Sequence, residues 1–170
     1  METERPTKRV INPNTRIGHV HLKVANIERA LWFYRDILGF EEVFAWNPRA
    51  PYIEELVGYP GVDLHAAVLR PPNTDVFLEL LEYRGVARTP VDTGTANPGT
   101  AHTAYFVDDL DTLYAELVAK GVSSVSPPVT PTIGPNKGGR AVYLLDPDGI
   151  RVELIESRTS FASYAAEQQS

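Results

Sequence analysis

Apolar and polar residues alternate along two stretches that lie far apart in the chain, His19–Val24 and His102–Val107. Each stretch sends successive side chains to opposite faces, as a half-buried strand does. Each also begins with a histidine and reaches a valine five residues later, just before the start of a predicted helix. The sequence therefore contains an internal repeat of a strand followed by a helix.

Apolar residues at spacings of three and four follow both strands and predict two amphipathic helices. The first helix is expected to open at Asn26 and the second at Asp108 or Asp109, since these side chains cap helix N-termini. Both helices should end at a glycine, Gly39 and Gly121, which can adopt the left-handed conformation. The apolar stripes consist of Ile27, Ala30, Leu31, Tyr34, Ile37 and Leu38 in the first helix and of Leu110, Leu113, Tyr114, Leu117 and Val118 in the second.

Each half of the chain closes on a strand that carries acidic residues among apolar ones. The closing strands are Asp75–Tyr83 and Ile150–Glu156, and the second follows a predicted turn at Asp146–Gly149. One or two further strands precede each closing strand, most clearly Val62–Leu69 and Ala141–Leu145. Each half is therefore predicted to be a β-α-β-β-β module.

These elements predict an α+β fold of two βαβββ modules, related by a pseudo-two-fold axis, whose sheets form an incomplete barrel. A single domain would span residues 16–157, with module 1 at 17–84, a linker at 85–100 and module 2 at 101–157. Residues 1–15 are expected to form a flexible arm, and residues 158–170 a tail that can be helical. The segment Pro48–Gly61 breaks the repeat and is the best candidate for a lid that faces the substrate.

The amino-acid composition argues against several classes of partner and of metal site. The net charge of −6 argues against nucleic acid as the main partner, because phosphate binding needs a basic face. No apolar run approaches the length of a membrane span, and the N-terminus lacks the apolar stretch of a signal peptide. The absence of cysteine excludes disulfides and thiolate metal sites. We therefore expect a cytoplasmic protein that acts on a small molecule.

The repeat places two histidines and two glutamates at equivalent positions. His19 and His102 lie on the first strand of each module, and Glu79 and Glu153 on the last. A pseudo-two-fold axis would gather all four around one centre. Two imidazoles and two carboxylates suit Zn, Ni, Co, Mn or Fe, and on an octahedral ion they leave two positions for water or substrate. The sequence therefore predicts an incomplete barrel around a metal site.

The recurrence of these residue types carries the metal hypothesis. A single histidine or glutamate in a strand is usually an ordinary hydrogen-bonded or solvent-facing residue. A buried carboxylate without a partner would cost several kcal/mol, and a metal ion would remove that cost. The same pair in both modules therefore favours metal ligands over structural residues.

Three segments carry a resemblance to a known family. Gly18–Phe40 resembles the opening signature of the glyoxalase/bleomycin resistance/extradiol dioxygenase superfamily, also called the vicinal oxygen chelate superfamily. His102–Leu110 resembles its second-module opening, and Asp146–Ile155 its closing strand. The resemblance covers residues 17–157 and points to the glyoxalase I-like or methylmalonyl-CoA epimerase-like branch. One departure is the pair Ala25 and Asn26, where the family often has an acidic residue before the helix; this affects helix capping and not the chemistry.

The resemblance implies a metal-dependent lyase or isomerase that moves a proton next to a carbonyl through a metal-stabilised enediolate. His19, Glu79, His102 and Glu153 would hold one divalent ion per site: Zn, Ni, Co or Mn. An extradiol-type dioxygenase, which binds Fe(II) through two histidines and one glutamate, is the alternative, although Glu79 would fill one of its open positions. A small-molecule binding or resistance protein is the third class, but such relatives usually lack these pairs.

The resemblance also implies roles for single residues. The closing-strand glutamate of the second module is the family's usual base, which favours Glu153, although the apolar neighbours of Glu79 leave it a candidate. By strand parity, His21 lies on the face of His19, about 6.6 Å further along the strand, and could bind and orient substrate, donate a proton, or simply hydrogen-bond in the sheet. Arg140 and Lys137 could bind the carboxylates of the substrate, or they could belong to a solvent-exposed turn. The resemblance implies a homodimer, and leaves open whether the site is completed within one chain or across the dimer.

Overall fold

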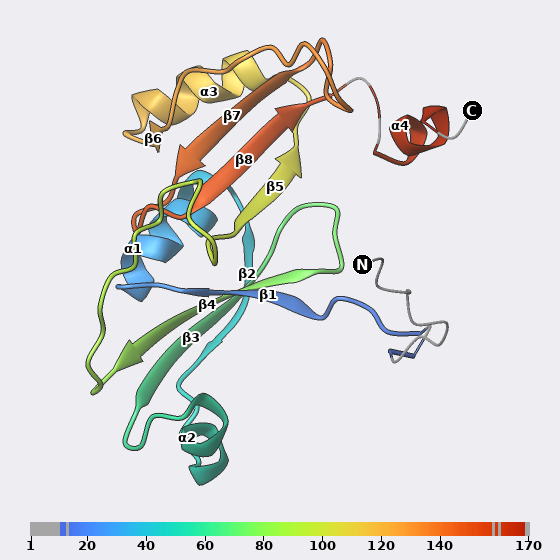
Figure 1. Ribbon diagram of the computed structural model, residues 1–170. Coiled ribbons are helices and arrows are strands. Elements are labelled where there is room, and N and C mark those ends of the chain that lie inside the picture. The colour runs from blue at the N-terminus through green and yellow to red at the C-terminus, as the bar shows by residue number, and fades with distance from the viewer. Residues whose placement is uncertain (1–10, 13, 158, 160, 169–170) are drawn as a thin grey trace.

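The strands of the protein form two four-stranded sheets with the same internal order. The structure, a computed structural model, describes residues 11–168 except 13, 158 and 160. The sheets are ordered β1-β4-β3-β2 and β5-β8-β7-β6, and they are not closed into a barrel (Figure 1). The predicted α+β fold of two β-α-β-β-β modules is confirmed. Most of the predicted N-terminal arm lies outside the described residues.

The two modules share the order strand, helix and three strands, and the first has α2 (Pro51–Val57) in addition. The first contains β1 (His19–Lys23), α1 (Ile27–Leu31), the π-helical η1 (Trp32–Ile37), β2 (Glu41–Trp46), α2 (Pro51–Val57), β3 (Asp63–Arg70) and β4 (Phe77–Arg84). The second contains β5 (His102–Phe106), α3 (Leu110–Ala119), β6 (Ser123–Ser124), β7 (Arg140–Leu145) and β8 (Arg151–Glu156). The last helix, α4 (Phe161–Glu167), lies in the predicted C-terminal tail. Among the described helices, none is both long and apolar enough to span a bilayer.

The first and last strands of each module are neighbours in the sheet. β1 pairs in parallel with β4, and β5 pairs in parallel with β8. Each last strand also pairs antiparallel with the strand before it. This arrangement brings each predicted histidine next to a predicted glutamate of the same module. Along the chain, 60 positions separate His19 from Glu79 and 51 separate His102 from Glu153.

The helix boundaries follow the predicted capping residues. The Asn26 side chain accepts a hydrogen bond from the Arg29 backbone N–H at 2.9 Å, and Asp109 accepts one from Thr112 at 3.1 Å. The two predicted terminating glycines, at positions 39 and 121, have φ values of 75° and 86°. The left-handed backbone there is open to glycine at little cost, which explains why both helices end at this residue type.

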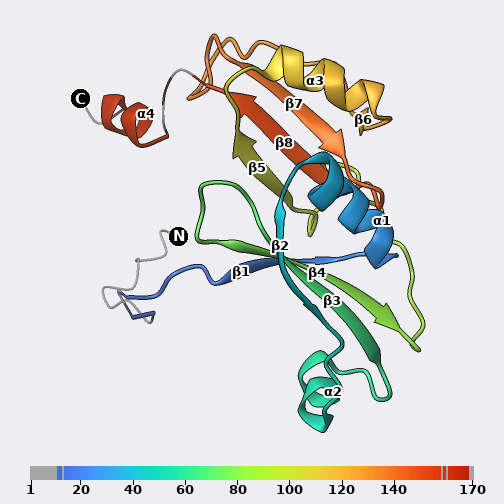
Figure 2. The ribbon, with the colours of Figure 1, turned by 180° about the vertical axis from the view of Figure 1, so that it is seen from behind.

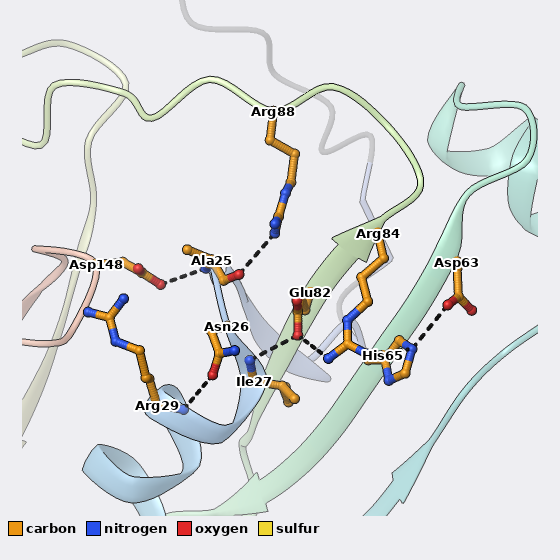
Figure 3. Close-up of polar contacts among 10 residues, drawn as sticks. All are labelled: Ala25, Asn26, Ile27, Arg29, Asp63, His65, Glu82, Arg84, Arg88 and Asp148. Atoms are coloured by element: carbon orange, nitrogen blue, oxygen red, sulfur yellow. Dashed lines mark hydrogen bonds and ion pairs between the residues drawn. The ribbon is translucent and has the colours of Figure 1, made fainter.

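A second glutamate on each closing strand holds the start of the helix in its own module. Oε2 of Glu82 accepts from the Ile27 backbone N–H at 3.1 Å and from Arg84 at 2.8 Å (Figure 3). Oε2 of Glu156 accepts from the Leu110 backbone N–H at 3.0 Å. The first N–H groups of a helix have no partner within the helix, so these carboxylates satisfy them.

One hydrophobic core joins the two modules. Buried residues of both sheets and of α1 and α3 belong to the same cluster, and α1 lies between the two sheets in both ribbon views (Figure 2). Within this core, the Tyr34 hydroxyl donates to Oδ2 of Asp146 at 3.0 Å. Oδ1 of Asp146 accepts from the backbone N–H groups of Asp148 and Ile150, which closes the predicted turn.

Candidate metal centre

In the first module, a histidine and a glutamate meet across the parallel strands β1 and β4. Nε2 of His19 lies 3.5 Å from Oε2 of Glu79. The register places His21 directly opposite Glu79, and His19 lies on the same face two residues earlier. Nδ1 of His21 is 3.9 Å from the same Glu79 oxygen. The first sheet therefore presents two imidazoles to one carboxylate.

The second module contains the equivalent His–Glu pair, but the residues next to its glutamate differ from those next to Glu79. Nε2 of His102 lies 3.2 Å from Oε2 of Glu153. Ala104 lies opposite Glu153 on β5, and Tyr143 lies opposite it on β7. The rings of Tyr143 and His102 are 5.3 Å apart in an edge-to-face arrangement. In place of a second imidazole, this sheet places a phenol beside the carboxylate.

The structure brings the four predicted metal ligands together as two pairs. Within the described part of the chain, the one group of three or more ligand atoms that lie within 4.8 Å of one another is His19, His21 and Glu79. The pair His102 and Glu153 is outside this group. The folded chain therefore carries two half-sites on two separate sheets.

His21 is in an unusual environment for a histidine. Burial, then the charge of Lys23 and then that of His19 lower the pKa of His21 to about 4. Its imidazole is therefore neutral near pH 7, which is the form that binds metal ions. Its Nε2 atom is buried and has no hydrogen-bond partner among the described residues.

The two predicted substrate-binding residues before the last strand pair lie elsewhere. Arg140 pairs in register with Glu156, the glutamate that caps α3, so it lies on the opposite face of the sheet from Glu153. Its guanidinium donates to Asp111 at 2.7 Å and to Thr130 at 2.9 Å. Lys137 is exposed in the segment between β6 and β7. The structure does not bring Arg140 together with the His–Glu pairs.

Sequence reasoning missed two aromatic residues on the face that carries Glu79. Phe44 on β2 pairs with Val68 on β3, which in turn pairs with Glu79. Phe44 and Trp46 contact each other edge-to-face, with ring centres 6.5 Å apart, although they are 51% and 45% exposed. The sequence signal was the two aromatic residues at alternate positions, Phe44 and Trp46. This spacing indicates a strand, but it does not show that the two side chains share the face of Glu79.

The predicted lid segment contains α2, which packs on this same face. Its buried Ile53 belongs to a small cluster with Leu64, Ala66 and Leu81. In the register, Leu81 lies two residues after Glu79, on the same side of β4. The helix is therefore beside the candidate centre, at the end of the sheet drawn lowest in Figure 1.

Residues 16–154 match the family model of the Glyoxalase/Bleomycin resistance protein/Dioxygenase superfamily. The chain belongs to this superfamily. A lactoylglutathione lyase from Haemophilus influenzae is 32% identical over 147 residues, which cover 85% of this chain and 94% of that protein. Among solved structures, a glyoxalase family protein from Bacillus cereus has a TM-score of 0.72 at 19% identity and covers 88% of this chain and 99% of its own. A trypanothione-dependent glyoxalase I from Leishmania major has a TM-score of 0.64 at 22% identity, with 92% and 96% covered.

The donor atoms of this superfamily member fit a divalent cation. Imidazole nitrogen and carboxylate oxygen are the ligands that Zn and its first-row neighbours accept. Both His–Glu pairs have their donor atoms at 3.5 Å or less, close to the separation of two ligands on one ion. The ring of His21 adds a third donor, because one ligand atom each of His19, His21 and Glu79 lie within 4.8 Å of one another.

Proposed function

We propose that this protein is a metal-dependent lyase of the glyoxalase I type, which moves a proton between adjacent carbons of a hemithioacetal formed from a thiol such as glutathione. The observation that carries the proposal is the equivalent His–Glu pair on each of the two sheets. The similarity to lactoylglutathione lyases supports the choice of substrate class.

In this proposal, four side chains hold the metal ion: His19, Glu79, His102 and Glu153. A bound divalent ion supplies Lewis acidity to the oxygen atoms next to the carbon that loses its proton. Zn, Ni, Co and Mn all fit this donor set. Both glutamates are only partly exposed, at 17% and 18%, so their carboxylates are held near the histidines by the sheet.

Glu153 is the proposed base. Its carboxylate takes the proton from the hemithioacetal carbon and returns it to the neighbouring carbonyl carbon. The hydroxyl proton passes from the oxygen of the first carbon to that of the second, so the thioester product is an isomer of the substrate. The adjacent Tyr143 has a raised pKa, because it is partly buried and lies near the negative Glu153. Its phenol therefore stays protonated and can donate a hydrogen bond to a substrate oxygen. Glu79 has Val68 at the corresponding position, which offers no such donor.

The proposal includes a homodimer in which module 1 of one chain faces module 2 of its partner. Two features support it: the half-sites are not joined within the described chain, and exposed aromatic side chains lie on the faces that carry them. Phe44, Trp46 and Phe106 share these faces, and Phe106 is 58% exposed. A partner module would cover this apolar surface and exclude water from the substrate.

One observation favours a second candidate, an Fe(II)-dependent dioxygenase. His19, His21 and Glu79 are two histidines and one carboxylate on one sheet, the donor set of many non-haem iron oxygenases. Against it, the pair His102 and Glu153 would then have no role in binding the ion. The lyase is therefore the preferred function.

Metal preference and oxygen dependence separate these candidates. Chelator-treated protein should regain hemithioacetal conversion on addition of Ni, Co, Mn or Zn under anaerobic conditions, followed by absorbance of the thioester product. Protein left without metal is the control. Oxygen consumption with Fe(II) and a catechol, without anaerobic conversion of the hemithioacetal, would instead establish the dioxygenase.

A further inference from the structure

The two half-sites differ at one position of the repeat. Two residues after the first-strand histidine, module 1 has His21 and module 2 has Ala104. Both positions lie directly opposite the closing-strand glutamate in register, Glu79 for one and Glu153 for the other. The sheet geometry is therefore the same, and only module 1 places an imidazole there.

The distances around Glu79 suit three ligands on one ion. Ligand nitrogen and oxygen atoms lie about 2.0–2.2 Å from a bound zinc ion, so two ligands on one ion lie about 3–4 Å apart. His19 and His21 place ring nitrogens 3.5 and 3.9 Å from the same oxygen of Glu79. One ligand atom from each of the three residues lies within 4.8 Å of the other two.

The two ring nitrogens of His21 lie in different surroundings. Nε2 is buried without a hydrogen bond within the described chain, whereas Nδ1 is the ring nitrogen that lies 3.9 Å from Oε2 of Glu79. The side chain is 24% exposed, so the ring is only partly covered. Nδ1 is therefore the atom of His21 that would bind an ion shared with His19 and Glu79.

We propose that His21 is a metal ligand together with His19 and Glu79, so that the first module holds the cation by itself. The inference rests on the proposed metal-dependent function and deepens it. Three ligands from module 1 anchor the ion, and module 2 contributes His102 and Glu153 when the full site forms. If module 1 held the ion in this way, the Glu153 carboxylate would be available to act as the base.

The test measures metal binding in the full-length chain after the second half-site is removed. The variant His102→Ala/Glu153→Ala should still bind about one Co(II) per chain in a calorimetric titration. Adding His21→Ala should weaken binding by more than about 100-fold, which exceeds the 10–100-fold loss caused by removing groups that only support a ligand. Pulsed electron paramagnetic resonance of the Cu(II)-loaded proteins should count two imidazoles before this change and one after it. His65→Ala in the same background is the matched control and should change neither readout.

A gain of binding provides an independent check that does not depend on the stability of the His21 variant. In the variant His19→Ala/Glu79→Ala, the further change Ala104→His should create the three-ligand set on module 2 and increase Co(II) affinity. Ala104 is exposed, so the larger side chain has room.

The outcomes separate this inference from the proposed function. Unchanged affinity and imidazole count after His21→Ala, or complete loss of binding in His102→Ala/Glu153→Ala while the unmodified protein binds metal, would overturn the role of His21 alone. An unmodified protein that binds none of Ni, Co, Mn or Zn would overturn the proposed function as well.

Discussion

Each closing strand carries two glutamates, three residues apart, that face opposite sides of the sheet. Glu79 and Glu153 lie beside histidines, whereas Glu82 and Glu156 bind the first N–H groups of the helices. An odd spacing in a strand reverses the face, so the two roles follow from position alone. The recurrence of His and Glu in both halves of the sequence predicted the role of Glu79 and Glu153 beside histidines. The capping role could not be predicted, because it depends on contacts across more than forty residues of chain.

The two carboxylates of the candidate centre should differ in their effect on turnover. Replacing Glu153 with Gln removes the proposed base, so we expect kcat to fall by about 10²–10⁴-fold, the usual contribution of a general base. Glu79→Gln should retain more activity, because the amide oxygen can still coordinate a metal ion. Steady-state kinetics combined with metal analysis of each variant measures both effects.

Metal content is the control for this comparison. Equal losses of activity in the two variants, at unchanged metal content, would mean that both carboxylates share the proton transfer. A larger loss for Glu79→Gln would reverse the assignment of the base.

At the scale of the elements, the first helix departs most from the pattern that predicted it. The apolar spacing predicted one continuous helix, but the structure changes from α1 to the π-helical η1 at Trp32. The Leu38 N–H bonds to the Phe33 carbonyl at 3.0 Å, five residues back. Phe33 and Tyr34 are both fully buried, which the wider turn permits. In the second helix, the predicted apolar residue Val118 is 48% exposed. Spacing alone does not identify which residues tertiary packing covers.

The cap of the first helix should make stability depend on acidity. Hydrogen bonds from Arg84 and then from the Ile27 backbone hold the pKa of Glu82 below its ordinary value. The folded state therefore binds the Glu82 proton less tightly than the unfolded chain does. The stabilisation is complete above the ordinary pKa of about 4.5 and is lost as the pH falls through the lower folded value.

We therefore expect Glu82→Gln to lower the free energy of unfolding at pH 7 and to flatten its decline below about pH 5. Urea unfolding measured by circular dichroism between pH 3 and 7 gives both quantities. The exposed Glu116 on α3 provides the matched control, since Glu116→Gln should leave the pH profile close to that of the unmodified protein. A decline of equal steepness in Glu82→Gln would contradict the capping role.

At the scale of the molecule, the turn before β8 connects the two modules through the first helix. Besides the Tyr34–Asp146 bond, the Ala25 backbone N–H donates to Asp148 at 2.7 Å, and Arg29 donates to the Pro147 carbonyl at 2.6 Å (the Ala25–Asp148 contact is drawn in Figure 3). The sequence predicted both the turn and the helix. It could not predict that they meet, because no periodic pattern encodes the packing of one module on the other.

This connection predicts a stability effect far from the candidate centre. Tyr34→Phe removes the donor to the buried Asp146 carboxylate, and we expect the free energy of unfolding to fall by about 1.5–3 kcal/mol. Chemical denaturation measures the change. Tyr52→Phe on α2 is the control, because Tyr52 is 59% exposed and its loss should have little effect. A change below that of the control would show that the bond contributes nothing to the contact between modules.

The His–Glu pairs were predictable from the repeat, but their division between two sheets was not. Equivalent positions in a repeat indicate symmetry, and the symmetry is the same whether a site closes within one chain or between two. The structure keeps the pair of module 2 apart from the group around Glu79. Because the two pairs lie on separate sheets, activity measurements on mixtures of two variants can test whether the site forms between two chains.

Mixing two inactive variants should restore activity if the site is completed across a dimer. His19→Ala/Glu79→Ala lacks the first half-site and His102→Ala/Glu153→Ala the second, so each alone should be inactive. In a mixed dimer, one site combines both damaged halves and the other combines both intact halves. After complete exchange of equal amounts, about a quarter of all sites are intact, so about a quarter of the original activity should return. A site closed within one chain would be damaged in every molecule and would recover nothing. Light scattering on the unmixed proteins confirms whether dimers are present, and a monomeric mass at micromolar concentration would contradict the dimer directly.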